Sequence, residues 1–402
     1  MDWSFLINDR SSLNVTTDSR KISAGCVFVA LKGDNFDGNM FALQALEQGA
    51  SLAIVDDEQV YNAIQAAGEY SALLVENSLL ALQDLAREWR RYLGTRIIGI
   101  TGTNGKTTTK ELLAAVLSTK YKTHYTQGNL NNSIGVPLTL LQLTREHELA
   151  IVEMGASHPG DIKELVEVAE PNCGLITNVG KAHLQGFGSF EGVMQTKAEL
   201  YDYLRAHGGF CFRNTDNPYL AQMAGDLETV AYCTGKMPEG TQLVGAYNSE
   251  NIQAALCVGE YFGVDRESGL AAIRAYVPSN NRSQKTVTEK NTLIVDAYNA
   301  NPTSMTAAIN AFKGDTYILG AMRELGEYSH TEHQNIVNML LERKADKVLL
   351  VGDEYRETTA PYPIFSNVEE LCEHLKQQPI SGCTILIKGS RSNKLEQVLP
   401  LL

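Results

Sequence analysis

The sequence lacks several features that would place a protein in a membrane or on nucleic acid. No stretch approaches the ~20 consecutive apolar residues of a membrane-spanning helix. The first residues, MDWSFLINDRSS, are acidic and polar where a secretion signal has an apolar core. Basic residues are outnumbered, with 34 Lys and Arg against 47 Asp and Glu, and the net charge is −13. We therefore expect no membrane span and no nucleic-acid partner, because nucleic-acid binding needs a basic surface.

Cysteine is also scarce, and its spacing excludes common structural uses. The seven cysteines form no Cys-x-x-Cys pair and their number is odd, which is typical of reduced thiols in a cytoplasmic protein. The hydrophobic fraction of 44% and the charged fraction of 20% are those of a globular protein. At about 150 residues per domain, 402 residues allow two or three domains. We expect a cytoplasmic monomer.

Short apolar runs alternate with amphipathic segments of helical length, which indicates α/β domains with parallel sheets. The pattern predicts three domains. Residues 1–82 form a small mixed α/β domain, and residues 83–280 form a central domain with a parallel sheet of the P-loop ATPase type. Residues 281–402 repeat the alternation as a Rossmann-like domain.

The central feature is a strand, a glycine loop and a helix in direct succession. Arg96–Ile100 is an apolar run rich in β-branched residues, Gly102 and Gly105 lie in the following loop, and Lys106 opens an amphipathic helix. Backbone N–H groups and the helix N-terminus attract phosphate, Lys106 reaches the β- and γ-phosphates, and Thr107 is a magnesium ligand in such loops. The alternative is an ordinary turn, since Ile100 stands where the common P-loop has its first glycine. The order of elements favours a nucleotide-triphosphate site.

Other candidates are weaker when each is taken alone. Ligands bind outside the carboxyl ends of parallel strands, and Glu153 and His183 follow the predicted strands 149–154 and 174–178. A strand-end glutamate in solvent and a structural histidine are the plain alternatives. Taken alone, Lys197 on an amphipathic helix is interpreted as a charge in solvent. Taken alone, Asp18-Ser19-Arg20 is interpreted as a turn in solvent.

Together, the motifs resemble the Mur ligase family, the ATP-dependent amide-forming enzymes of bacterial cell-wall synthesis. The resemblance covers essentially the whole chain and all three predicted domains. The resembling segments are TGTNGKTTTKE (101–111), GNLNNSIGVPLTLL (128–141), VEMGAS (152–157), TNVGKAHLQGFGS (177–189), KAEL (197–200), AYNSEN (246–251), DAYNANPTSM (296–305), MRELG (322–326) and KGSRS (388–392). Asn39, Tyr247 and Ala321 depart from the family pattern, in which His, His and Asp are common.

The resemblance implies ATP and Mg²⁺ as cofactors. The residues implied for ATP are Gly102, Thr103, Asn104, Gly105, Lys106, Thr107, Thr108, Asn248, Asn251, Arg282 and Asp296. Those implied for magnesium are Thr107, Glu153, His183 and Lys197, the last as a carbamylated lysine whose neutral amine has added carbon dioxide. Lys106, Lys197, His183 and Arg282 form the implied catalytic set.

The resemblance also implies substrates and their contacts. DAYNANP and KGSRS are similar to the members that join D-alanyl-D-alanine to UDP-N-acetylmuramoyl-tripeptide through an acyl phosphate. Domain 1–82 would bind the UDP moiety, and domain 281–402 the dipeptide, with a hinge near residues 279–285. The implied contacts are Ser19 and Arg20 for the UDP moiety, Asn131, Asn132 and Ser157 for the muramyl peptide, Lys388, Ser390 and Arg391 for the dipeptide, and Tyr298, Asn299 and Asn301 as further substrate contacts.

Three alternatives stay open at this point. One is another amide ligase of the superfamily, either one that adds diaminopimelate or lysine or one of the folylpolyglutamate synthase type. The second is a P-loop kinase with a stable phosphorylated product, and the third is a nucleotide sensor without turnover. The joint presence of Lys197, Glu153 and Arg282 disfavours the sensor.

Overall fold

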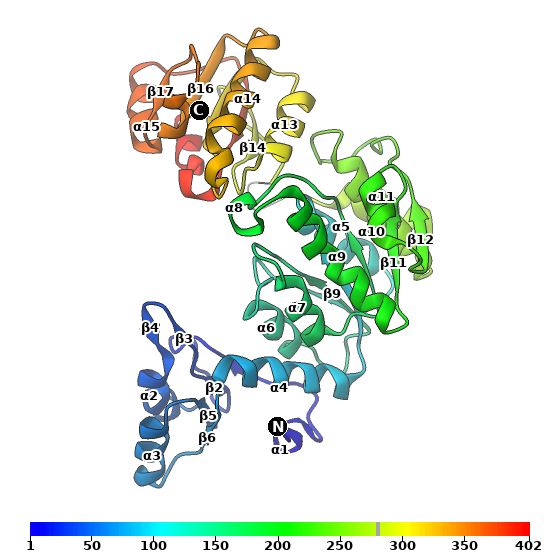
Figure 1. Cartoon of the computed structure of the whole chain (residues 1–402), viewed down its shortest axis with the longest axis vertical. Helices are drawn as coiled ribbons and strands as arrows, with labels where there is room; N and C mark the ends of the chain where they lie inside the picture. The colour runs from blue at the N-terminus through cyan, green and yellow to red at the C-terminus, as the bar shows by residue number, and fades with distance from the viewer. Residues whose placement is uncertain (279–281) are drawn as a thin grey trace.

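A computed structural model describes residues 1–278 and 282–402 and has three α/β domains in a curved arrangement (Figure 1). The predicted fold class is confirmed. The expected boundary between residues 280 and 281, and the first residues of the expected hinge at 279–285, lie outside the described residues. Within the described ranges, no helix combines the length and apolarity needed to span a bilayer.

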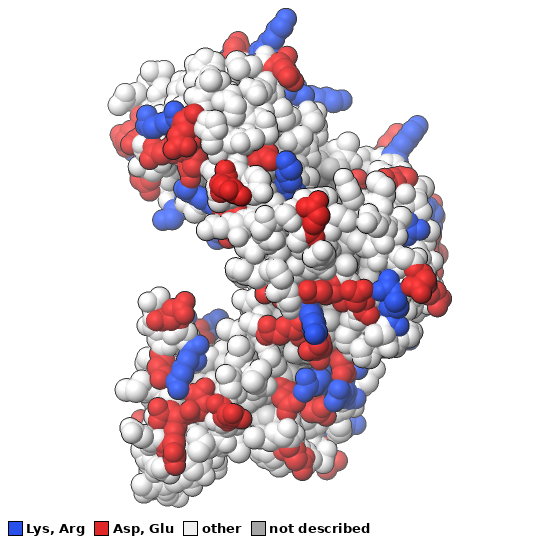
Figure 2. Space-filling model, viewed as in Figure 1, with Lys and Arg blue, Asp and Glu red and all other residues white. Residues whose placement is uncertain are grey.

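The first domain is built on a four-stranded parallel sheet in the order β1-β2-β5-β6. Its strands are β1 (Val15–Thr16), β2 (Val27–Val29), β5 (Leu52–Val55) and β6 (Ala72–Leu74), and its helices are α2 (Ala42–Glu47) and α3 (Glu58–Ala67). A small hairpin of β3 (Lys32–Gly33) and β4 (Phe36–Asp37) projects from the sheet. In Figure 1 this domain lies at the lower left, separated by an open space from the third domain at the top. Figure 2 shows this space as a notch in the molecular surface.

Helix α4 (Ser78–Leu93) joins the first domain to the central one. Asn77 caps it, accepting a hydrogen bond from the Leu80 amide, whereas Ser78 donates its hydroxyl to Asp56. The Trp89 side chain is fully buried, and its indole N–H donates to the Leu143 carbonyl over 3.0 Å. Since α4 is continuous from Ser78 to Leu93, the expected boundary at residues 82/83 falls inside a helix. The helix also packs on helices of the central domain.

The central domain holds a six-stranded sheet in the order β12-β11-β10-β7-β9-β8, with all pairs parallel. The strands are β7 (Arg96–Thr101), β8 (Thr123–Tyr125), β9 (Leu149–Glu153), β10 (Cys173–Ile176), β11 (Phe210–Asn214) and β12 (Thr229–Tyr232). The three strands predicted here correspond to β7, β9 and β10. From β7 the chain runs to β8 and β9 on one side of the sheet and then crosses to β10, β11 and β12 on the other. The loop after β7 therefore lies where the strand order reverses, which is where such sheets bind ligands.

Helices cover both faces of this central sheet. On one face α5 (Lys106–Leu117), α11 (Asn248–Tyr261) and α12 (Arg266–Ala275) share one apolar core. On the other face the helices are α6 (Gly135–Leu141), α7 (Asp161–Ala169), α9 (Phe190–Ala206) and α10 (Pro218–Ala224), with the short α8 (Leu184–Phe187) at one end.

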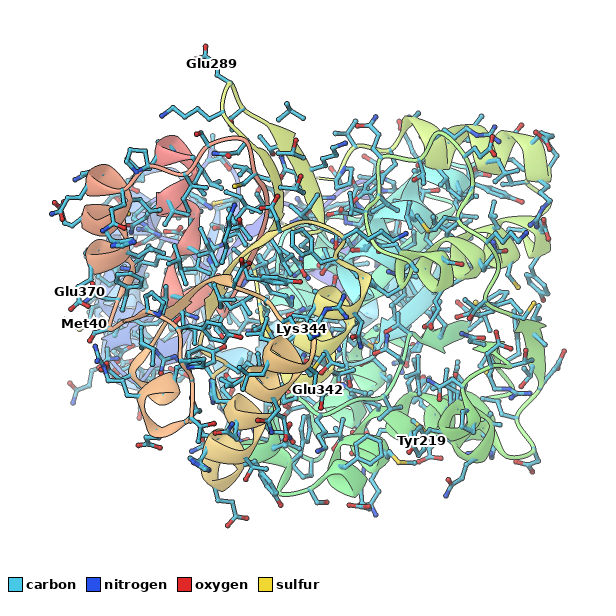
Figure 3. All side chains as sticks on the ribbon, turned by 90° about the horizontal axis from the view of Figure 1, so that it is seen from above. Met40, Tyr219, Glu289, Glu342, Lys344 and Glu370 are labelled. Atoms are coloured by element: carbon cyan, nitrogen blue, oxygen red, sulfur yellow. The ribbon has the colours of Figure 1, made fainter. Side chains whose placement is uncertain are left out.

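The third domain has a six-stranded sheet in the order β13-β14-β18-β15-β16-β17. Its elements are β13 (Gln284–Val287), β14 (Thr292–Asp296), α13 (Pro302–Ala311), β15 (Thr316–Gly320), α14 (Ser329–Glu342), β16 (Lys347–Val351), β17 (Ile364–Phe365), α15 (Val368–Gln377) and β18 (Thr384–Lys388). Only β13 is antiparallel among these described strands, and Glu289 projects from the tip of the β13–β14 hairpin (Figure 3).

The second and third domains are in direct contact. The Lys181 ammonium pairs with Glu332 over 2.7 Å, and the Lys181 amide donates to the Thr303 hydroxyl over 3.0 Å. The side chains of Asn104 and Asn301 hydrogen-bond each other across the same boundary, over 2.8 and 3.4 Å. The loop after β7 is therefore attached to the third domain.

Candidate active site

A cavity of about 1240 Å³ lies at the carboxyl ends of the central strands and is closed on one side by the third domain. Most of the predicted site residues line it. From the central domain these are Thr103, Asn104, Gly105, Lys106, Thr107, Thr108, Asn131, Asn132, Glu153, Ser157, His183, Asn248 and Asn251, and from the third domain or just before it Arg282, Asp296, Tyr298, Asn299, Lys388, Ser390 and Arg391.

The loop after β7 needs both of its glycines. Gly102 has φ +143° and Gly105 has φ +79°, in the range that favours glycine. A Cβ on Gly102 would collide with the Thr177 hydroxyl, and one on Gly105 would collide with the Asn251 amide. The loop therefore packs against both neighbouring segments. The amides of Thr103 and Asn104 donate to Asn178, over 2.9 and 3.0 Å, and the α5 N-terminus lies at the cavity.

Lys106 is the first residue of α5 and lies over this loop. Its ammonium donates to the carbonyls of Gly102 and Thr103, over 2.7 and 3.2 Å. Burial lowers the pKa of Lys106, and the Glu153 carboxylate opposes that shift. The phosphates of a bound nucleotide would favour the charged form further.

Glu153 ends β9 as a buried carboxylate facing the loop. Its Oε1 accepts hydrogen bonds from the Thr107 hydroxyl over 3.2 Å and from the Asn131 amide over 2.9 Å. Its Oε2 is buried and accepts no hydrogen bond from residues 1–278 or 282–402; the Lys110 ammonium lies 3.8 Å away. A carboxylate oxygen without a hydrogen bond, beside a threonine hydroxyl, suits a hard cation such as Mg²⁺. These residues fit the implied metal.

Lys197 is buried on α9, with only 3% of its surface exposed. Its ammonium position is 5.8 Å from the centre of the Phe187 ring. Burial lowers the pKa of Lys197 well below its usual range, Lys106 adds to that shift, and Asp161 opposes it. The shift favours the neutral amine, which is the form that reacts with carbon dioxide. The solvated alternative for Lys197 is wrong.

His183 occupies the N-terminal boundary of α8 with φ +49°. Its Nδ1 contacts the Glu324 carboxylate of the third domain. Burial lowers the pKa of His183 although that carboxylate opposes the shift, and the neutral ring that burial favours is the form that binds a metal. Within residues 1–278 and 282–402, no group of three or more His, Cys, Asp or Glu side chains gathers as a metal site, so a site here would need Thr107 and a modified Lys197.

The residues expected at the nucleoside lie on α11 and β14. The Asn251 amide donates to Asn248 over 2.9 Å and accepts from the Thr109 hydroxyl over 3.1 Å. Asp296 accepts from the Lys388 ammonium over 2.6 Å. The Arg282 guanidinium lies 3.8 Å from the centre of the Tyr298 ring. Asn251 thus supports the loop itself, while Arg282 and Asp296 carry the third domain's charges into the cavity.

Five predicted residues do not line the cavity. Lys197 and Gly102 lie just behind its wall, and Asn301 caps α13, accepting from the Ser304 amide over 2.8 Å while it pairs with Asn104. Ser19 and Arg20 lie in the first domain. The Arg20 guanidinium donates to Asp18 over 2.8 and 2.9 Å and is 86% exposed.

Sequence reasoning missed several residues of the cavity wall. Arg323 and Glu324 follow β15, and Thr303 lies in the first turn of α13. Arg323 and Glu324 belong to the segment MRELG (322–326), which is one of the segments that resemble the family but to whose residues no role was assigned. Their position after a buried strand, at the carboxyl edge of the third sheet, was the available signal. Tyr247 also lines the cavity, and its hydroxyl bonds that of Ser283 over 2.6 Å.

A phosphate loop at the switch point of a parallel sheet, closed by a second nucleotide-binding-type domain, defines a nucleotide-dependent enzyme that works at a domain interface. Three family models match along the chain. They are described as Mur ligase family, catalytic domain (residues 13–90), Mur ligase middle domain (100–236) and Mur ligase, glutamate ligase domain (281–391). The chain belongs to the Mur ligase family and is an ATP-dependent ligase.

Individual relatives match over nearly the whole chain. UDP-N-acetylmuramoyl-tripeptide–D-alanyl-D-alanine ligase of Bacillus subtilis is 34% identical, with 96% of this chain and 92% of the relative covered. The enzyme of that name from Escherichia coli is also 34% identical, with 96% and 93% covered. Among solved structures, MurF from Thermotoga maritima in complex with ADP has a TM-score of 0.86 at 28% identity and 98% coverage of both chains. MurF from Acinetobacter baumannii has a TM-score of 0.83 at 29% identity, with 96% and 92% covered.

Proposed function

We propose that the protein joins D-alanyl-D-alanine to the terminal carboxylate of UDP-N-acetylmuramoyl-tripeptide, using ATP, in peptidoglycan precursor synthesis. The observation that carries the proposal is that one cavity is lined by the Lys106 loop and the buried Glu153 carboxylate, with the Lys197 amine buried close enough to Lys106 for the two charges to interact. The names of the relatives from B. subtilis and E. coli support the choice of substrates.

A carboxylate is a poor electrophile, so the chain must activate it before the amine attacks. Lys106 would hold the β- and γ-phosphates of ATP while the γ-phosphoryl group passes to the peptide carboxylate, giving an acyl phosphate. The dipeptide amine would then attack, and phosphate would leave from a tetrahedral intermediate. Arg282, beside Tyr298, would neutralise charge from the third domain.

Magnesium would be held by Thr107, Glu153, His183 and a carbamylated Lys197, and it would neutralise charge on the transferring phosphoryl group. The chain's own contribution is to prepare these ligands. Glu153 presents an oxygen with no hydrogen bond, and Thr107 and Asn131 fix the other oxygen. Burial lowers the pKa of Lys197 and of His183, and so favours the neutral form of each.

The substrates would enter from the two outer domains. Asn131, Asn132 and Ser157 line the cavity from the central domain and would contact the muramyl peptide. Lys388, Ser390 and Arg391 line it from the third domain and would contact the dipeptide. Tyr298 and Asn299 also line the cavity and would complete the substrate contacts. Asn301, outside the cavity lining, would act by joining the third domain to Asn104. Ser19 and Arg20 would meet the UDP moiety.

Contact between the second and third domains would keep water from the acyl phosphate until the amine arrives. The observed contacts of Lys181 with Glu332 and of Asn104 with Asn301 support such a closed arrangement. We further propose a cytoplasmic monomer; all seven cysteines are free thiols in the structure, which supports a reducing compartment.

A product assay tests this proposal. The protein would be supplied with ATP, Mg²⁺, and UDP-muramyl peptides ending in lysine or diaminopimelate, each with D-alanyl-D-alanine, diaminopimelate, lysine or glutamate. We expect an amide product and equal amounts of ADP and phosphate only with the dipeptide. Preference for a single amino acid would contradict the substrate assignment, and a stable phosphorylated product without an amide would identify a kinase.

A further inference from the structure

Helix α5 carries two lysines one turn apart, and only one of them has a part in the proposed reaction. Lys106 lines the cavity. Lys110 lies four residues further on the same side of the helix, does not line the cavity, and is 1% exposed. A fully buried lysine is costly unless its charge is compensated, so its position behind the site requires an explanation.

The surroundings of Lys110 supply one counter-charge at close range. Its ammonium lies 3.8 Å from Glu153 Oε2 and 5.7 Å from the centre of the Tyr125 ring. That oxygen is the one that accepts no hydrogen bond, since Thr107 and Asn131 both donate to Oε1. Both side chains are almost fully buried, at 1% and 3% side-chain exposure, so each is the close counter-charge that the other needs.

We propose that Lys110 is a positioning residue that serves as the counter-ion of Glu153. Its ammonium stabilises the carboxylate while no divalent cation is bound. The same ammonium lowers the affinity of the site for a divalent cation. The inference rests on the proposed metal role of Glu153. Two like charges in a poorly solvated site repel each other strongly, so a divalent cation at Glu153 and the Lys110 ammonium would compete for the same carboxylate.

This arrangement would limit how tightly the site holds a cation. Removing one partner of a buried ion pair leaves the other uncompensated and destabilises the fold. A metal-free protein without Lys110 would therefore lose stability that a divalent cation could restore. Removing both charges together would cost less than the sum of the single changes, because the pair acts as a unit.

The test compares the unmodified full-length protein with Lys110→Met, Glu153→Gln and the double variant, with Lys122→Met as a control. Lys122 also pairs with a glutamate, Glu146, but both side chains are at least 70% exposed. Binding of Mn²⁺ in the presence of saturating ADP would be measured by electron paramagnetic resonance, and thermal unfolding would be measured with and without Mn²⁺.

We expect Lys110→Met to bind Mn²⁺ on the order of tenfold more tightly, to melt earlier than the unmodified protein without Mn²⁺, and to gain more from Mn²⁺. Lys122→Met should change neither property. Unchanged or weaker Mn²⁺ binding by Lys110→Met would overturn the counter-ion role alone. If the unmodified protein bound no more Mn²⁺ than ADP does by itself, the proposed metal site would fail and Lys110 with it.

Should Lys110→Met not fold, the double variant decides. Recovery of folding when Glu153→Gln is added supports the charge pairing. Failure of the double variant to fold would assign Lys110 to packing and overturn the proposal.

Discussion

The pair of Lys110 and Glu153 and the pair of Arg20 and Asp18 both join a basic to an acidic side chain, but the first pair is buried and the second is exposed to solvent. Glu153 and Lys110 are almost fully buried, and their charged groups lie 3.8 Å apart. Arg20 is 86% exposed and is already paired with Asp18 two residues away. The buried charges need particular partners, because no water solvates them. The exposed Arg20 is solvated by water and paired with a neighbour in sequence, so it needs no further partner.

The comparison teaches where a short charged motif is informative. A buried, unprotonated lysine such as Lys197 has few structural uses, so its environment points to chemistry. An exposed pair such as Asp18–Arg20 is equally consistent with a turn and with a ligand contact.

Replacing Lys197 should have the largest effect. Lys197→Ala removes the amine that would become a metal ligand, and we expect turnover to fall by about 10²–10³-fold, with partial recovery on adding acetate or formate. The exposed Lys163 is the control, and Lys163→Ala should leave the rate unchanged. Steady-state rates of ADP release measure both. A Lys197→Ala enzyme with full activity would remove the carbamate from the account.

Gly105→Ala should have the next largest effect. The change places a Cβ against Asn251 and forces alanine into φ +79°, so the loop must shift, and we expect KM for ATP to rise by about 10–100-fold. Gly128→Ala is the matched control, because Gly128 also has positive φ, +55°, but its Cβ would meet nothing within 4 Å. Equal KM values for the two variants would show that backbone strain alone, and not the Asn251 contact, governs the loop.

Asn301→Ala should give a moderate effect with two components. It removes the α13 cap, which costs about 1 kcal/mol of unfolding free energy, and the hydrogen bonds to Asn104. Asn367 caps α15 in the same domain without touching the loop. We expect similar losses in denaturant unfolding for Asn301→Ala and Asn367→Ala, but a raised KM for ATP only in the former. A raised KM in both would point to general destabilisation of the domain.

Arg20→Ala should have the smallest effect. The side chain is exposed and its pair with Asp18 is local, so thermal stability should not change. If Arg20 meets the UDP moiety, KM for the UDP-muramyl peptide should rise by about two- to fivefold while KM for ATP stays the same. An unchanged KM for the UDP substrate would favour the solvated turn.

The central strands were predictable because their residues form continuous apolar runs. The phosphate loop was predictable because its glycines follow such a run directly and precede a helix. β7, β9 and β10 lie at the middle of their sheet and are almost entirely buried, so each appears as a continuous apolar run. The edge strands β8 and β12 are only partly buried, and their mixed sequences gave no comparable pattern.

Site residues were predictable where a motif surrounded them and not where tertiary contacts define their role. The loop, Glu153 and Lys197 belong to segments with recognisable order. The pairing of Asn301 with Asn104, 197 positions away, and of Lys110 with Glu153 depends on how the domains and helices meet. Asn301 was expected at the substrate, but its amide is used as a helix cap and a domain contact.

The claim on which the account depends is that the central domain activates a carboxylate by phosphorylating it. The direct measurement uses UDP-muramyl tripeptide whose terminal carboxylate carries ¹⁸O, with unlabelled ATP, D-alanyl-D-alanine and water, and determines the isotopic mass of the released phosphate. One ¹⁸O should appear in each phosphate released, because the carboxylate oxygen stays with phosphorus when the amine displaces it. Amide formation with unlabelled phosphate would contradict the acyl phosphate and with it the assigned role of the site.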